Sequence, residues 1–308
     1  MVAWKRLVLS VCCIAALPAG VGSGLGAREV ALTFDDLPRH GALPPAVTRV
    51  DVARSTIESL QQWNSPKTYG FINAKKLQDD PSGMEVLKLW RAAGFPLGNH
   101  TFSHMDLNAN TVEEFEKDIA LNEPLLRSLM GAEHWHWFRY PYLREGDTLD
   151  KMRSVAAHLK ASGYRNARVT LDFEDYAWNG PYARCAEKND AEAIEWLKAS
   201  YLDTAAEYIE LGQKMARIVH GRDIKHVMLL HIGGFNMVIL PELLKLLRQR
   251  GFRLITLEDA YSDTAYESDP DLPSKFGKTL LEQMMIVKNL EIPKHKEKPF
   301  TKLEAICR

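Results

Sequence analysis

The sequence predicts an α/β fold in which about seven parallel strands alternate with helices, as in a (β/α) barrel or a wound sheet. Two observations support this prediction. Short segments rich in strand-favouring residues alternate with longer segments whose apolar residues recur every three to four positions, which is typical of amphipathic helices. Most of the short segments also end in acidic, histidine or arginine residues. In parallel sheets and barrels, the chemistry lies at the carboxyl ends of the strands.

The first stretch of the chain has the layout of a secretory signal peptide. Two basic residues precede an apolar run over 7–19, and small residues follow it. The apolar run is too short for a spanning helix. We therefore expect residues 1–27 to be removed, with cleavage between 19 and 27. The mature protein is then expected to be secreted or periplasmic, with no stable membrane span. Lipid attachment at Cys12 is the less favoured alternative, because the residue before it is larger than expected there.

The composition limits which partners and which redox chemistry are expected. The 308 residues carry a formal net charge of -1, so there is no electrostatic case for a nucleic-acid partner. Nothing in the sequence implies a protein partner. Signal cleavage would leave two of the four cysteines, Cys185 and Cys307. In an oxidising compartment an even pair predicts a disulfide, and two unrelated thiols are the alternative.

The first predicted strand begins at Val30 and runs directly into Asp35 and Asp36. Leu37-Pro38 follows, and a proline cannot continue a strand. The two acids either end the strand with turn chemistry or carry function at its carboxyl end. Beyond them, the pattern predicts a helix over 47–63, a strand over 67–72, a helix over 84–93 closed by Gly94, and a short strand over 95–98.

Two histidines follow this third strand with a spacing that suits a metal ion. His100 and His104 are four residues apart, so one helical turn or a tight loop can bring both imidazoles to one ion. Two neutral imidazoles and a carboxylate suit Zn²⁺ and leave a coordination position for water. An ordinary pair of surface or core histidines is the alternative. Because Asp36 also follows a strand, a metal site shared by Asp36, His100 and His104 is the better interpretation.

The middle of the chain continues the alternation of helices and strands. The pattern predicts a helix over 110–131 that is kinked or split at Pro124, and then a strand that ends in Arg139. The aromatic residues beside Arg139 serve packing in part, and the guanidinium near acids is the functional element. The next elements are predicted to be a helix over 147–159 and a strand over 164–171, followed by Asp172-Phe173-Glu174-Asp175-Tyr176.

The last third departs from this simple alternation. A loop is expected over 178–189, followed by one long helix or two over 190–219, as a helical insertion at about 177–222. A sixth strand over 226–230 ends in His231, and a helix over 240–250 and a strand over 252–255 complete the pattern. The expected organisation is therefore a catalytic domain over 28–262 and an irregular tail over 263–308, with one helix near 280–290.

Five strand-end segments, taken together, resemble the motifs of the polysaccharide deacetylase family, which has the NodB homology domain and forms carbohydrate esterase family 4. The resemblance covers about residues 30–260. The similar segments are Thr33-Phe34-Asp35-Asp36, His100-Thr101-Phe102-Ser103-His104, Arg139-Tyr140-Pro141-Tyr142, Asp175-Tyr176 and Leu229-Leu230-His231. The resemblance implies a distorted parallel (β/α) barrel of seven or eight strands, which agrees with the count of about seven.

The resemblance also implies a role for each matching residue. Asp36, His100 and His104 would bind a divalent metal, most commonly Zn²⁺, with Co²⁺, Ni²⁺, Mn²⁺ or Fe²⁺ as alternatives. Asp35 would act as the general base, and Arg139 would hold it in place. The remaining roles would fall to the backbone N–H of Tyr142 at the oxyanion, Asp175 orienting the general acid His231, Leu229 in the acetyl pocket and Tyr176 at the substrate.

The implied function is the metal-dependent removal of N-acetyl groups from the sugars of a polysaccharide or oligosaccharide. The sequence departs from the family pattern at Leu37, where Gly is usual, and at Tyr176, where Trp is usual. The distance along the chain from Asp175 to His231 is also longer than expected. These departures leave the metal and acid–base positions intact and affect the substrate groove. The alternatives are an amidohydrolase of another non-peptide C–N bond and an inactive barrel that binds glycans.

Overall fold

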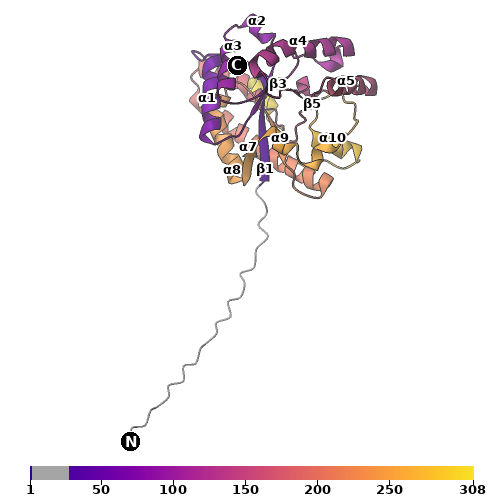
Figure 1. Ribbon diagram of the computed structural model, residues 1–308. Helices are drawn as coiled ribbons and strands as arrows, with labels where there is room; N and C mark the ends of the chain where they lie inside the picture. Colours follow the sequence, from indigo (N-terminus) through magenta and orange to yellow (C-terminus); the bar gives the residue numbers. More distant parts are fainter. Residues whose placement is uncertain (2–27) are drawn as a thin grey trace.

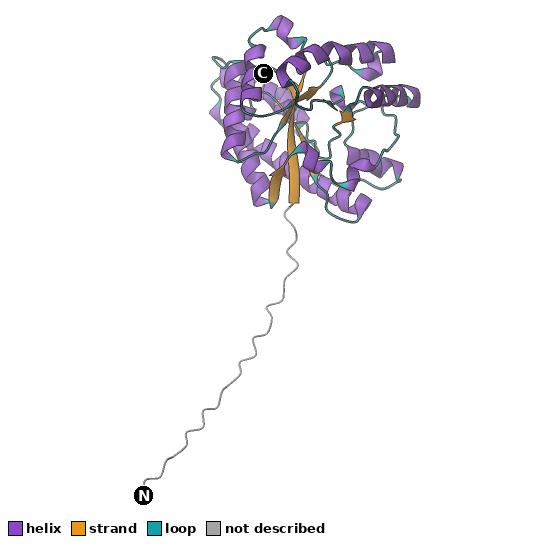
Figure 2. Ribbon diagram, viewed as in Figure 1, coloured by secondary structure: helices purple, strands orange, loops and turns teal. Residues whose placement is uncertain are grey.

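The computed structural model describes Met1 and residues 28–308, and within them the predicted α/β fold is confirmed. Seven strands in these residues form one curled, parallel sheet, and helices cover its outer side (Figures 1 and 2). The predicted signal peptide and Cys12 lie outside the described residues. No helix in the described part of the chain is long and apolar enough to cross a bilayer.

The strands are short, except for the first. They are β1 (Arg28–Leu37), β2 (Tyr69–Ile72), β3 (Leu97–Asn99), β4 (Trp137–Phe138), β5 (Arg165–Asn166), β6 (His226–His231) and β7 (Phe252–Ile255). The sheet order is β5-β4-β3-β2-β1-β6, and β7 also pairs with β1. A bridge between Leu171 and Met228 links the segment after β5 to β6. The sheet therefore curls towards closure, as the predicted distorted (β/α) barrel requires.

Strand β1 is the centre of this sheet. Residues 28–31 pair with β7, residues from Thr33 onward pair with β2, and residues 30–35 pair with β6 along the other edge. The side chains of β1 are buried from Val30 onward, because strands and helices surround it. This burial explains why its sequence reads as a nearly continuous apolar run before the two aspartates.

Helices follow most of the strands and pack on the outside of the sheet (Figure 2). Several begin with a side-chain cap, as at Thr48, Thr111 and Thr279, where capping boxes satisfy the first backbone N–H groups. The helices are α1 (Arg49–Gln62), α2 (Lys76–Asp79), α3 (Gly83–Ala92), α4 (Val112–Met130), α5 (Leu149–Ala161), α6 (Asn179–Glu187), α7 (Ala191–His220), α8 (Asn236–Gln249), α9 (Leu257–Ala260), α10 (Leu280–Val287) and α11 (Phe300–Ala305).

The structure corrects two details of the predicted helices. Of the kink or split predicted at Pro124, the split is wrong, because helix α4 is continuous from Val112 to Met130. Its buried face, which includes Phe115, Ile119 and Leu126, packs on the core. The loop predicted over 178–189 is helix α6. Pro181 lies in the first turn of α6, where the backbone N–H of a residue has no intrahelical partner, so the proline does not disturb the helix.

The strand predicted over 164–171 is also corrected, because only β5 and the bridge at Leu171 pair with the sheet. Side chains satisfy several of the backbone groups between them. The Tyr261 hydroxyl donates to the carbonyl of Asn166 at 2.6 Å and accepts from the N–H of Arg168 at 2.5 Å. Arg139 donates to the carbonyl of Ala167 at 2.5 Å. Backbone groups that have such partners need no strand ladder.

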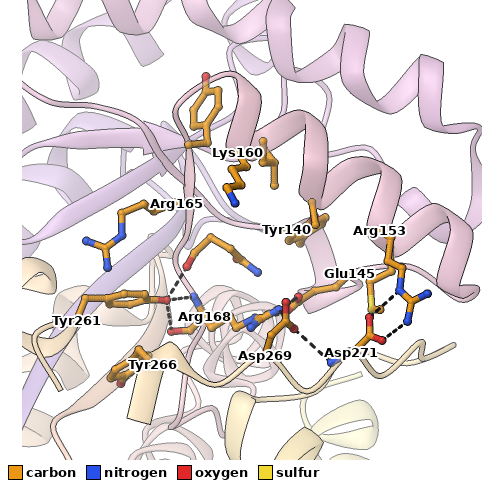
Figure 3. A pocket seen from close by; sticks show the side chains of 15 residues that line it. Tyr140, Glu145, Arg153, Lys160, Arg165, Arg168, Tyr261, Tyr266, Asp269 and Asp271 are labelled. Atoms are coloured by element: carbon orange, nitrogen blue, oxygen red, sulfur yellow. Dashed lines mark hydrogen bonds and ion pairs between the residues drawn. The ribbon is translucent and has the colours of Figure 1, made fainter. Parts of the chain in front are cut away.

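Residues 263–308, called the C-terminal segment below, are more ordered than predicted, since α11 accompanies the expected helix α10. Leu281 and Met285 of α10 pack against Leu211 and Met215 of α7. Ion pairs fix the part before α10: Arg168 pairs with Glu145 and Asp269, and Arg153 pairs with Asp271 (Figure 3). These charged residues line a hollow of about 280 Å³.

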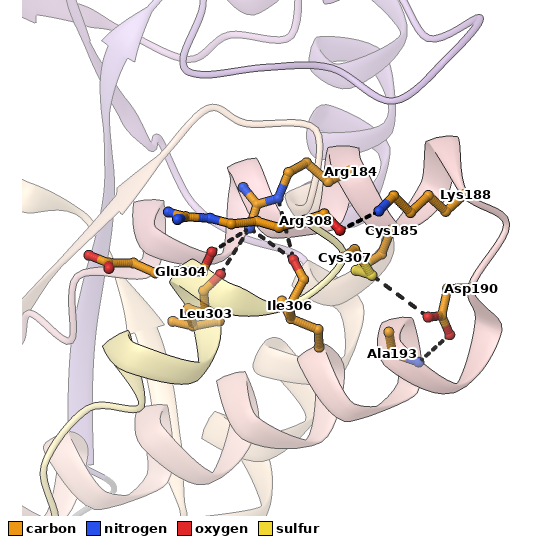
Figure 4. Close-up of a disulfide and its surroundings, with 10 residues drawn as sticks. All are labelled: Arg184, Cys185, Lys188, Asp190, Ala193, Leu303, Glu304, Ile306, Cys307 and Arg308. Carbon is orange, nitrogen blue, oxygen red and sulfur yellow. Dashed lines mark hydrogen bonds between the residues drawn. A yellow bond between two sulfur atoms is a disulfide. The ribbon is translucent and has the colours of Figure 1, made fainter.

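The predicted disulfide between Cys185 and Cys307 is confirmed. It joins α6 to the end of the C-terminal segment, with 5.1 Å between the two Cα atoms (Figure 4). Arg184 beside it donates to the carbonyls of Leu303 and Ile306 at 3.0 Å each. The C-terminal segment is therefore attached to the helix that follows Asp175.

Candidate metal and acid–base site

A cavity of about 390 Å³ lies at the carboxyl ends of the strands, where parallel sheets carry their sites. The structure brings all ten of the residues singled out in the sequence to this place. Arg139 and Asp175 stand behind the cavity as partners of its lining residues. The other eight line it, and they are Asp35, Asp36, His100, His104, Tyr142, Tyr176, Leu229 and His231.

An irregularity in β1 places the two aspartates. The register between β1 and β2 shifts between Phe34 and Leu37, and Asp36 has a φ of 71°. Such a bulge redirects side chains at the end of a strand. Asp35 therefore reaches Arg139, while Asp36 turns towards the histidines. Neighbours in sequence thus acquire different partners.

Asp35 is paired with a guanidinium that is itself fully buried. Arg139 donates through Nη1 to the carboxylate of Asp35 at 3.1 and 3.3 Å, and through Nη2 to the hydroxyl of Thr33 at 3.1 Å. Burial raises the pKa of Asp35, and the charge of Arg139 only partly opposes this effect. The charge of Arg139 does favour the ionised carboxylate, but desolvation is the larger influence, so the net shift of the pKa is upward.

Asp36, His100 and His104 form the candidate metal group. One ligand atom from each lies within 4.8 Å of the other two. Oδ1 of Asp36 is 3.5 Å from Nε2 of His104. Nδ1 of His100 is 2.7 Å from the backbone carbonyl of Arg139. Donation from Nδ1 to that carbonyl would leave Nε2 with the free lone pair, which is the usual arrangement of a histidine ligand.

The electrostatic environment keeps both imidazoles able to bind a cation. Burial lowers the pKa of His100 to about 3 and that of His104 to about 3, so both rings are neutral at physiological pH. A neutral imidazole offers a lone pair, whereas a protonated one does not. With the carboxylate of Asp36, this donor set fits a divalent transition metal such as Zn²⁺.

Buried asparagines shape the loop that carries the two histidines. Asn73 donates to the carbonyls of His100 and Thr101 at 2.6 and 3.0 Å. Asn99 accepts from the N–H of Thr101 at 2.9 Å, and Asn122 of α4 donates to Asn99 at 3.0 Å. Thr101 and His104 have φ angles of 59° and 60°, a region that most residues avoid. This network of amides holds the loop in that conformation.

Two residues that sequence reasoning missed contact the carboxylate of Asp36. Lys76, at the start of α2, donates to Oδ1 at 2.6 Å, and Nδ1 of His40 lies 2.7 Å from Oδ2. Burial alone would raise the pKa of Asp36, but Lys76 and His40 hold it well below its usual value. The spacing of four residues between Asp36 and His40 was a usable signal. No sequence signal pointed to Lys76.

His231 and Asp175 form a tight pair on the other side of the cavity. Nδ1 of His231 lies 2.6 Å from Oδ1 of Asp175, and the backbone N–H of His231 donates to Oδ2 at 2.9 Å. Burial would lower the pKa of His231, but the carboxylate of Asp175 raises it to about 9. The imidazole is therefore protonated near neutral pH and can donate a proton from Nε2.

The remaining lining residues form the rim and floor of the cavity. Leu229 on β6 is buried, whereas Tyr142 and Tyr176 are exposed at the rim. The ring of Tyr142 packs against that of His104 with 4.5 Å between the ring centroids, and the ring of Tyr176 packs against that of His231 with 5.3 Å between them. Other lining residues were not predicted as site residues, and they include Arg144, Asp172, Glu174 and Phe276.

The chain is similar to deacetylases in sequence. The polysaccharide deacetylase family model matches residues 23–165. A chitin deacetylase from Arthroderma benhamiae is 26% identical over 147 residues, which cover 48% of this chain and 35% of that protein. The alignment thus spans about a third of the length of this curated relative.

The fold is also similar to those of solved structures. A chitin deacetylase from the fungal pathogen Colletotrichum lindemuthianum is 21% identical with a TM-score of 0.51, and the match covers 82% of this chain and 92% of that one. A variant of a carbohydrate esterase family 4 pseudoenzyme from Bacillus anthracis, described as having restored activity, is 15% identical with a TM-score of 0.50. That match covers 76% of this chain and 68% of the other. At these identities the structures establish the fold alone.

Proposed function

We propose that this chain, a member of the polysaccharide deacetylase family, is a metal-dependent hydrolase that removes N-acetyl groups from the sugars of a glycan. One observation carries the proposal: a single cavity holds an Asp/His/His group together with Asp35 and with His231, which is hydrogen-bonded to Asp175. Amide hydrolysis needs an activated water, a base, stabilisation of negative charge on the oxygen and an acid for the leaving amine, and these residues can supply such functions.

Asp36, His100 and His104 would hold the metal, most simply Zn²⁺. Such an ion supplies Lewis-acid polarisation of the amide carbonyl and lowers the pKa of a coordinated water. The chain contributes two neutral imidazoles and an ionised carboxylate, because the pKa values of all three groups are lowered. Lys76 and His40 would keep the carboxylate ionised and oriented.

Asp35 is the proposed general base. Its carboxylate is buried beside His100, with 3.6 Å between Oδ2 of Asp35 and Nε2 of His100, so it borders the proposed ion. Arg139 fixes the orientation of the carboxylate. Asp35 would accept the proton of the attacking water as the new C–O bond forms.

His231 is the proposed general acid. The amine can leave only when its nitrogen is protonated, and Nε2 of His231 would give that proton while Asp175 holds Nδ1. After the products leave, Asp35 would release its proton to solvent and His231 would take one up from solvent, which returns the site to its starting state. Proton transfer thus proceeds from opposite sides of the reacting carbon.

The oxyanion and the acetyl group require two further contacts. The backbone N–H of Tyr142 would donate to the developing oxyanion. Leu229, buried in the cavity wall, would contact the methyl of the acetyl group. The substrate class is an N-acetylated polysaccharide or oligosaccharide, and the predicted signal peptide favours a secreted or periplasmic location for its hydrolysis.

Acetate release tests this proposal. The metal-loaded protein is incubated with N-acetylglucosamine oligomers and with amides that contain no sugar, and acetate or amine is measured. Release from the oligomers that stops on chelation and returns with added Zn²⁺ would support the proposal. Hydrolysis of the other amides alone would identify an amidohydrolase, and oligomer binding without release would identify an inactive glycan-binding barrel.

A further inference from the structure

The exposed aromatic side chains of residues 28–308 line two adjoining hollows. Across residues 28–308, four aromatic side chains are exposed, with exposed fractions of 54% for Tyr142, 42% for Tyr176, 68% for Phe276 and 39% for Phe300. Tyr142, Tyr176 and Phe276 line the catalytic cavity. Tyr176 and Phe300 line a second hollow of about 430 Å³. Exposed apolar groups that gather in this way mark a binding surface.

The two hollows adjoin each other, since Glu174 and Tyr176 line both. A residue of the C-terminal segment holds the wall that the two hollows share. Lys298 pairs with Oε1 of Glu174 at 2.7 Å, and the hydroxyl of Tyr176 donates to Oε2 of Glu174 at 3.0 Å. A ligand that is longer than the catalytic cavity can therefore pass over Tyr176 into the second hollow.

Phe276 and Phe300 both belong to the C-terminal segment, outside the residues matched by the family model. Both are held by contacts to the rest of the chain. Asn108 donates to the carbonyls of Ser274 and Lys275 at 3.0 and 3.3 Å, and this supports the loop before Phe276. Helix α11 begins with Phe300 and is attached to α6 by the disulfide and by Arg184 (Figure 4).

We infer that Phe276 and Phe300 of the C-terminal segment form two additional sugar-binding subsites, which extend the catalytic cavity beyond Tyr176 for further residues of an N-acetylated oligosaccharide. The inference rests on the function proposed above. A pyranose ring presents a face of C–H groups that packs on an aromatic ring, while its hydroxyls remain free for polar partners. Arg184 and Glu304 line the second hollow and supply such partners.

Binding of oligomers of different length tests the inference without relying on turnover. The Asp35→Asn variant is loaded with Zn²⁺, and calorimetry measures its affinity for N-acetylglucosamine and for the hexamer. The hexamer should bind at least about tenfold more tightly than the single sugar. Phe300→Ala and Phe276→Ala, each made in this background, should each remove a large part of that advantage.

Two controls make the result specific. Phe300→Tyr keeps an aromatic ring and should restore the hexamer affinity lost in Phe300→Ala. Ile292→Ala removes an exposed apolar side chain of the same segment that lines neither hollow, and the hexamer affinity should be unchanged. Circular dichroism checks that every variant is folded.

The outcomes separate the two proposals. Equal affinity for the single sugar and the hexamer, or full affinity in both alanine variants, would refute the subsites even if acetate is released normally. If the wild-type protein neither binds nor deacetylates either compound, the substrate proposed above is wrong, and the subsites are rejected with it.

Discussion

At the scale of single residues, the two neighbouring aspartates show how environment divides chemical roles. Asp35 is buried beside Arg139, and burial raises its pKa. Asp36 contacts Lys76 and His40, which hold its pKa well below the usual value. A carboxyl with a raised pKa can exchange a proton, whereas one with a lowered pKa remains an anion. This difference supports the proposal that Asp35 is the base and Asp36 is the ligand.

Substitution of each aspartate should therefore have a different result. Asp36→Ala is expected to lose stoichiometric metal, because it removes the anionic ligand. Asp35→Asn is expected to keep the metal and to lose activity about 10²–10⁴-fold, as the removal of a general base does. Elemental analysis after dialysis, alongside acetate release, measures both. Full metal content in Asp36→Ala would contradict the ligand assignment.

The pair of His231 and Asp175 should set the alkaline side of the pH–rate profile. The pKa of His231 is raised to about 9 by Asp175, so the protonated form is present below that pH and is lost as the pH rises through it. A bound cation nearby would repel the imidazolium, so the alkaline limb in the loaded enzyme should lie between about 6.5 and 9.

Asp175→Asn should move this alkaline limb to lower pH by roughly one unit or more, since the neutral imidazole is then less disfavoured. The measurement is kcat against pH at saturating substrate. Asp172→Asn is the control for charge alone, because Asp172 lines the cavity and interacts with His231 through charge but makes no hydrogen bond to it, so it should move the alkaline limb less. An unchanged alkaline limb in Asp175→Asn would remove the pair from the mechanism.

The sequence was informative about residues whose chemistry is local. Asp35, Asp36, His100 and His104 are recognisable because acids and histidines follow short apolar strands. Lys76 could not be found in this way, since its contact with Asp36 depends on how α2 follows β2 in space. The direction in which the pKa of Asp35 shifts could not be predicted either, because it depends on how deeply the carboxyl is buried.

At the scale of elements, the rim of the cavity depends on a close approach between two loops. A Cβ added at Gly277 would lie 1.8 Å from the backbone carbonyl of Tyr142, so no larger residue fits without movement. The loop at Gly277 therefore presses on the turn Pro141–Leu143, which carries the proposed oxyanion donor. Glycine is required here by space rather than by backbone conformation.

Gly277→Ala should displace the turn at Tyr142. We expect a loss of about 1–3 kcal/mol in the free energy of unfolding and a lower kcat with the metal retained. Gly180→Ala in α6 is the control, because its Cβ would meet only the Arg184 side chain at 3.7 Å, and it should be neutral or stabilising. Urea denaturation and acetate release measure both. Equal behaviour of the two variants would show that the loops can move apart freely.

Helices and strands were predicted well where their apolar residues recur with a regular period. The strand before Asp35 and the long helix α7 follow from apolar periodicity. Helix α6 was missed because Asn179, Gly180 and Pro181 are typical of loops, although a first helical turn tolerates them. Strand β5 was predicted too long because side-chain partners of the backbone, such as Tyr261, come from distant positions.

At the scale of the whole molecule, the disulfide links residues 122 positions apart and ties the C-terminal segment to the site. Replacing both Cys185 and Cys307 by Ser should lower the free energy of unfolding by about 2–4 kcal/mol. It should also reduce hexamer affinity more than single-sugar affinity, since Phe300 would lose its support. Urea denaturation with and without reductant provides the test: reductant should destabilise the wild-type protein and leave the double variant unchanged.

Strand β1 also has a consequence for the order in which the protein is made. It is the first element of the described fold, but its partners β6 and β7 begin at His226 and Phe252. Pairing across such sequence distances is slow, because a long loop must be closed before any contact forms. During synthesis, one edge of β1 therefore remains unpaired until most of the chain has left the ribosome. If the predicted signal peptide directs the chain to a secretion channel, a chain that folds this late would still be unfolded when it crosses, and Asp35 and Asp36 would reach their final environment only outside the cytoplasm.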